Sequence, residues 1–66
     1  MKKIFRVFAR DAESRFINYD SFYTTEQSKE EFIAQLEKDH EGSIVIVEVN
    51  EYTVEEVVKL LNLYIE

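Results

Sequence analysis

The residues of this chain best suited to chemistry are acidic side chains on two segments that read as helices. Glutamates lie near one face of the first segment and in the first turn of the second, and we take these as the candidate partner-binding residues: Glu30, Glu37, Glu41, Glu55 and Glu56. Carboxylates one helical turn apart have a spacing similar to phosphates along a nucleic-acid strand. Such a surface could imitate a polyanion and be steered into a basic channel. The ordinary alternative is a solvated helix face whose acids favour the helix N-terminus.

The single histidine, His40, lies among the acids Glu37, Asp39 and Glu41. A histidine beside carboxylates could bind a metal or act as a general base. A metal site needs more strong ligands at recognisable spacing, and a histidine in the last turn of a helix commonly favours the helix dipole. Neighbouring helical glutamates also point in different directions and do not flank one bond. We therefore expect no enzyme, no cofactor and no bound metal, and an enzyme that uses His40 is the weakest alternative.

Two arginines near the N-terminus, Arg6 and Arg10, alternate with Phe8. Aromatic and arginine side chains together can stack on single-stranded nucleic acid. The net charge of −6 repels a polyanion, however. Pairing of these arginines with Glu48 or Asp20 on neighbouring strands is the favoured interpretation, and we expect no direct binding of nucleic acid.

The composition describes one small folded domain, residues 1–66, with an uneven charge. Residues 1–15 carry five basic side chains against two acidic ones, whereas residues 16–66 carry three against twelve. A chain this short buries only about 60 % of its unfolded surface, so its stability is marginal. No cysteine is present, which removes disulfides, fits a reducing compartment and leaves oligomerisation as a way to gain stability. No apolar run approaches a membrane span, and we expect a cytoplasmic protein.

The pattern predicts three strands and two helices in the order ββαβα. Alternating apolar residues favour strands at Lys3–Arg10, Arg15–Tyr23 and Ser43–Val49, the first two joined by a loop of three to five residues. Capping-box spacing and apolar stripes predict helices from Ser28 to Glu41 and from Val54 to the C-terminus.

The sequence marks the end of the first predicted helix and the apolar side of the last one. Gly42 lies where the first helix should end in a left-handed residue. The last helix carries a wide apolar stripe, formed by Val54, Val57, Val58, Leu61, Tyr64 and Ile65, with Leu60 and Leu63 beside it.

The predicted fold class is α+β, with a three-stranded sheet of order 2-1-3 and two helices packed on one of its faces. The covered face is expected to hold Phe5, Val7, Ile17, Tyr19, Val45, Val47 and Val49, with Phe16 as an alternative to Ile17. The other face is expected to stay open and to display Ile4, Arg6, Phe8, Arg10, Ile44, Ile46 and Glu48. An open face this apolar usually marks an interface.

Two functional hypotheses follow. The first is a small, acidic, non-enzymatic protein-binding module that inhibits or regulates a nucleic-acid-handling protein by imitating nucleic acid. Small acidic proteins of phages and mobile elements, including some anti-restriction and anti-CRISPR proteins, offer an analogy of class. The alternative is a homodimer that assembles through the open sheet face, with the acidity serving solubility only.

Overall fold

A computed structural model describes residues 2–65 and the side chains of residues 2–62. The elements are β1 (Lys3–Asp11), β2 (Tyr19–Thr25), α1 (Lys29–His40), β3 (Ile44–Tyr52) and α2 (Val54–Ile65). The sheet order is β2-β1-β3, and both neighbours of β1 run antiparallel to it. The predicted α+β class, element order and strand order are therefore confirmed.

Both helices begin with the predicted cap chemistry. The Ser28 hydroxyl accepts the Glu31 backbone N–H at 3.2 Å and donates to the Glu31 carboxylate at 3.0 Å. At the start of α2, the Thr53 hydroxyl accepts the Glu56 backbone N–H at 3.1 Å, while the Thr53 N–H donates to the Glu56 carboxylate at 3.0 Å. These bonds satisfy N–H groups that a helix start leaves without partners.

The end of α1 uses two left-handed residues. Glu41 is the C-cap with a φ of 44°, and Gly42 follows with a φ of 80°. The Glu41 N–H donates to the Glu37 carbonyl at 2.9 Å, which closes the last turn. Gly42 takes the predicted left-handed conformation, but Glu41 shares it.

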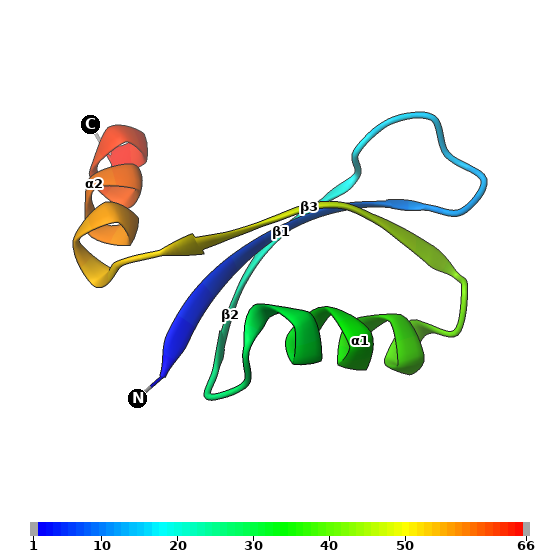
Figure 1. The fold of residues 1–66 in the computed structure, drawn as a ribbon. Helices are drawn as coiled ribbons and strands as arrows, with labels where there is room; N and C mark the ends of the chain where they lie inside the picture. The colour runs from blue at the N-terminus through cyan, green and yellow to red at the C-terminus, as the bar shows by residue number, and fades with distance from the viewer. Residues whose placement is uncertain (1, 66) are drawn as a thin grey trace.

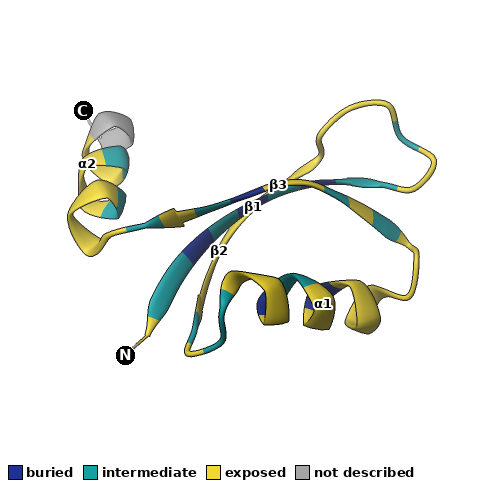
Figure 2. Ribbon diagram, in the orientation of Figure 1, coloured by how far each residue is buried: buried dark blue, intermediate teal, exposed yellow. Residues whose placement is uncertain are grey.

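The core lies between α1 and one face of the sheet (Figure 1). Among the side chains of residues 2–62, six apolar ones are buried there, namely Phe5, Val7, Ala9, Phe32, Leu36 and Val49. The Phe32 ring of α1 stacks on Phe5 of β1 with a centroid separation of 5.1 Å. Because one helix cannot cover three strands, most of β2 stays exposed (Figure 2).

The second helix does not pack beside α1, contrary to the prediction of two helices on one face. Figure 1 shows α2 beyond the end of β3, on the side of the sheet opposite α1. One residue, Thr53, separates β3 from α2. Because β3 is an edge strand and α1 already contacts it, so short a connection cannot carry α2 past α1 to the uncovered strand β2.

A β-bulge in β3 overturns part of the predicted face assignment. The pairing register shifts between Phe8 and Ala9, so that Phe8 lies opposite Glu48 and Ala9 opposite Ile46. An extra residue in one strand reverses the faces of all residues beyond it. Ile44 and Ile46 therefore pack against the core instead of lining the open face, while Val45 and Val47 are exposed instead of buried.

The connection between β1 and β2, residues 12–18, is longer than predicted, because side chains take over its backbone hydrogen bonds. The Ser14 hydroxyl bonds both the N–H and the carbonyl of Phe16, and the Asn18 amide oxygen accepts the Asp11 N–H. Such local bonds compete with a strand ladder. Phe16 and Ile17, expected within a strand and at the core, are exposed loop residues.

Candidate binding surfaces

The uncovered side of the sheet is the largest surface that the fold leaves without a layer. Strand pairing brings alternate residues of all three strands onto it. We call it the open face, formed by Ile4, Arg6, Phe8 and Arg10 of β1, Asp20, Phe22 and Thr24 of β2, and Val45, Val47, Glu48, Asn50 and Tyr52 of β3. The four predicted residues of β1 thus lie together.

Arg6 is the centre of the open face. Its guanidinium forms a bidentate pair with Asp20, at 2.9 Å from Nε and 2.7 Å from Nη2, and a bond of 3.2 Å to the Tyr52 hydroxyl. The guanidinium carbon also lies 4.7 Å from the ring centroid of Phe8 and 5.5 Å from that of Phe22. These cation–π distances and the fork geometry fix the side chain in place.

The charges of the Arg6 site hold one another in their ionised forms. The hydrogen bonds to Asp20 and Tyr52 keep the pKa of the Arg6 guanidinium above its usual value. The hydrogen bond from Arg6 lowers the pKa of the Asp20 carboxyl. The pairing that the sequence suggested for Arg6 is therefore with Asp20, and this pair is the only ion pair among the described side chains.

Arg10 is bound to its own loop. Its Nη1 donates to the Ser14 carbonyl at 2.7 Å and lies 3.4 Å from the Asp11 carbonyl. Arg10 therefore helps to hold the β1–β2 connection in shape and does not pair with Glu48 within the described structure.

The second helix presents an unpartnered apolar stripe. Val54, Val58 and Leu61, spaced at helical intervals, are all exposed, and Val54 is 68 % exposed. Val57 and Leu60 are half-buried. The remaining residues of the predicted stripe, Leu63, Tyr64 and Ile65, lie outside the described side chains. A helix stripe of this width normally packs against another element.

The predicted acidic residues do not form one surface. Glu30, Glu37 and Glu41 are exposed on α1 or at its end, whereas Glu55 and Glu56 begin α2. The two helices lie on opposite sides of the sheet (Figure 1). Two lysines, Lys29 and Lys38, also interrupt the acids of α1.

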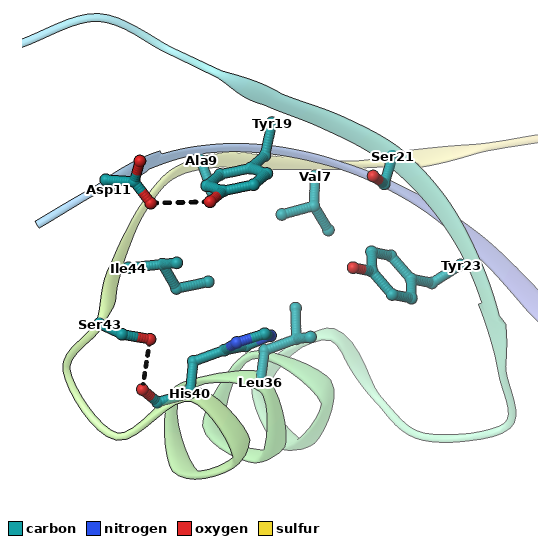
Figure 3. Close-up of a pocket in the computed structure, with 10 residues that line it drawn as sticks. All are labelled: Val7, Ala9, Asp11, Tyr19, Ser21, Tyr23, Leu36, His40, Ser43 and Ile44. Atoms are coloured by element: carbon teal, nitrogen blue, oxygen red, sulfur yellow. Dashed lines mark hydrogen bonds between the residues drawn. The ribbon is translucent and has the colours of Figure 1, made fainter. Parts of the chain in front are cut away.

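A cavity of about 310 Å³ opens between α1 and the part of the sheet that α1 leaves uncovered. Figure 3 shows His40 and Tyr23 directed into it, with Val7, Leu36 and Ile44 forming apolar walls. At one end the Tyr19 hydroxyl donates to the Asp11 carboxylate at 2.7 Å, and this bond raises the pKa of Tyr19.

The imidazole of His40 has no hydrogen-bonded partner among the described residues, and the His40 backbone carbonyl accepts from the Ser43 hydroxyl and N–H. In the cavity, His40 therefore forms no hydrogen-bonded pair with a serine or tyrosine hydroxyl among the described residues; the Tyr19 hydroxyl is bonded to Asp11 instead. No group of three or more metal-ligating side chains forms among the described residues either.

Fold and surfaces together define an α+β domain with one covered sheet face, one open face and a second helix whose described side chains are half-buried or exposed. No protein-family model, curated protein or solved structure matches the chain. Within residues 2–65, neither helix has the length and apolar character needed to cross a bilayer.

Proposed function

We propose that this protein is a non-enzymatic self-association module that forms a homodimer through its open face. The observation that carries the proposal is the open face itself: Phe8, Phe22, Val45 and Val47 surround the Arg6 site, and within residues 2–65 the helix that packs on the sheet, α1, lies on its other side (Figure 1). Exposed apolar patches on small domains usually mark interfaces. A second copy would supply the missing layer and enlarge a buried core of six side chains.

The charge of the open face suits a second copy better than a basic partner. Its two arginines, Arg6 and Arg10, are balanced by two acids, Asp20 and Glu48. The chain as a whole carries −6, so the acids that would repel another copy lie mainly outside this face. A partner selected by charge would be drawn to those acids instead.

The shape of the chain supports the same proposal. Its radius of gyration is 12.9 Å and its smallest dimension is 13 Å. A compact domain of this length has a radius of gyration of roughly 11 Å. The radius of gyration is larger than that value because a helix extends from the end of a single sheet layer. Pairing of two open faces would give a more compact shape.

A matched pair of lysine substitutions tests the homodimer. Val47→Lys places a charge within the proposed interface, on the edge strand β3, at a side chain that is 50 % exposed in the single chain. Ala34→Lys places the same charge on the exposed side of α1. Light scattering after size exclusion should give a dimer mass for the natural chain and for Ala34→Lys, and a monomer mass for Val47→Lys. A dimer that survives Val47→Lys would refute the proposed interface.

The acidic-decoy hypothesis stays a prediction with less geometric support, since its residues lie on two sides of the sheet. The same measurement separates it from the homodimer. Reversing Glu30 and Glu37 to Lys should leave the dimer mass unchanged, because α1 lies on the other side of the sheet from the open face. A basic protein partner and a cytoplasmic location remain expectations from the sequence.

A further inference from the structure

We infer that the two copies pair with their strands reversed end to end, so that α2 of each copy covers the β1–β2 loop of the other. This inference rests on the proposed function and adds the arrangement. It assigns a role to α2, and it identifies residues 12–18 as the surface that receives it.

The register places α2 and the β1–β2 loop at opposite ends of the sheet. Ile4, near the start of β1, pairs with Tyr52, just before α2. Asp11, at the other end of β1, leads into the loop and pairs with Ile44. Figure 1 shows α2 and the loop both rising on the side away from α1. The open face is thus bordered at each end by a raised element.

Both raised elements expose apolar side chains. The loop presents Phe16, which is 79 % exposed, and Ile17, and α2 presents Val54, Val58 and Leu61. Sheets that pack face to face lie about 10 Å apart. A helix is also about 10 Å across, so a raised α2 spans that gap and reaches the end of the second sheet.

The area that a stable dimer needs also requires these elements. Three strands of nine residues or fewer present a face of roughly 400 Å² in projection. A stable interface removes about 800 Å² from each partner. The open face alone supplies about half of this, and contact by one α2 and one loop from each copy would supply much of the rest.

Charge favours the reversed arrangement over a parallel one. With the strands reversed, Glu55 and Glu56 of α2 would lie near the other copy's loop, whose charges, Glu13 and Arg15, balance. With the strands parallel, each pair of glutamates would lie against its own counterpart. Like charges brought together cost affinity, so the arrangement that sets the glutamates against a loop without net charge is favoured.

The chain has no cysteine, so introduced cysteines report the arrangement without background. The test compares the double variant Phe16→Cys/Val58→Cys with each single variant under mild oxidation. A disulfide needs Cα atoms within about 7 Å. Within one copy, residues 16 and 58 lie at opposite ends of the sheet. Their separation is about 30 Å, the length of a nine-residue strand, so the double variant cannot close a disulfide within one copy.

Reversed pairing predicts that the double variant forms a disulfide-linked dimer on non-reducing denaturing gels. Both single variants should run as monomers on the same gels. A control double variant, Ala34→Cys/Val58→Cys, should not cross-link. Covalent dimers of Val58→Cys alone would show parallel pairing and overturn the inference. A chain that is dimeric by mass but does not cross-link would also overturn it, while leaving the proposed function intact. A monomeric natural chain would overturn both.

Discussion

At the residue scale, the least expected feature is the left-handed Glu41 before Gly42. A side chain in this conformation costs about 1 kcal/mol or more, whereas glycine adopts it freely. A Cβ added at Gly42 would meet no atom within 4 Å, so only its backbone conformation with a φ of 80° opposes substitution.

Substitutions at Glu41 and Gly42 should therefore change the free energy of unfolding in opposite directions. Glu41→Gly should raise the free energy of unfolding by about 1 kcal/mol, and Gly42→Ala should lower it by about 1–2 kcal/mol. Urea unfolding followed by circular dichroism measures both. Destabilisation by Glu41→Gly would show that the glutamate side chain contributes more than its backbone costs.

The Arg6–Asp20 pair gives a pH dependence with a defined sign. Arg6 lowers the pKa of Asp20 in the folded chain, so the ionised carboxylate favours folding. This stabilisation is complete above the unfolded-state pKa of about 4 and is lost as pH falls through the lower folded-state pKa. Because the Asp20 side chain is 45 % exposed, solvent screens the pair and we expect an effect below about 1 kcal/mol.

Asp20→Asn should remove that dependence. Thermal unfolding of the monomeric Val47→Lys chain, with and without Asp20→Asn, should differ at pH 7 and converge toward pH 2. Glu13→Gln, an exposed acid without an ion pair among the described side chains, is the control and should have little effect. Equal responses of Asp20→Asn and Glu13→Gln would contradict the role given to Arg6.

At the element scale, α1 and α2 have the same length, 12 residues, but they differ in how far their described side chains are buried. α1 inserts two buried side chains, Phe32 and Leu36, into the core. The described side chains of α2 are half-buried or exposed. Tertiary packing supplies most of the stability of a helix in a protein, and the described side chains of α2 bury little apolar surface within the chain.

Truncating one apolar side chain on each helix should change the free energy of unfolding by different amounts. In the monomeric Val47→Lys chain, Leu36→Ala should cost about 2–5 kcal/mol because it leaves a cavity in the core. Val58→Ala, at an exposed site, should change the unfolding free energy by less than about 0.5 kcal/mol. Chemical denaturation of both variants provides the measurement, and a large loss for Val58→Ala would show that α2 packs within one chain.

The elements also show what the sequence can predict. Alternation in β1 correctly places Phe5 and Val7 in the core, and the Ser28 and Thr53 caps correctly mark both helix starts. The bulge in β3 could not be predicted, because a run of β-branched apolar residues from Ile44 to Val47 fits either face. The site at Arg6 depends on which strand residues lie opposite it, and the long β1–β2 loop shifted the expected position of β2.

The position of α2 had a partial signal in the sequence. A single residue between Tyr52 and Val54 restricts where the helix can go. The apolar stripe of α2 nevertheless predicts packing in the same core as α1, because apolar periodicity indicates that a helix has a face to bury but not which element covers that face. The sequence likewise places the acidic residues on two helices. It does not indicate that those helices lie on opposite sides of the sheet.

At the scale of the whole molecule, one layer of helix and one layer of sheet leave half of the fold without a cover. Domains normally bury each apolar face against another layer. In our proposal the missing layer is a second copy: the balanced charges of the open face would permit its approach, and the raised ends would set its direction. The remaining acids would then lie on the outside of the dimer, where they favour solubility.

The most direct test of this account is the mass of the natural chain by sedimentation equilibrium over a range of concentrations. We predict a reversible rise from the chain mass of 7.9 kDa to twice that value, with no larger species. A mass that stays at 7.9 kDa up to the highest soluble concentration would contradict the account.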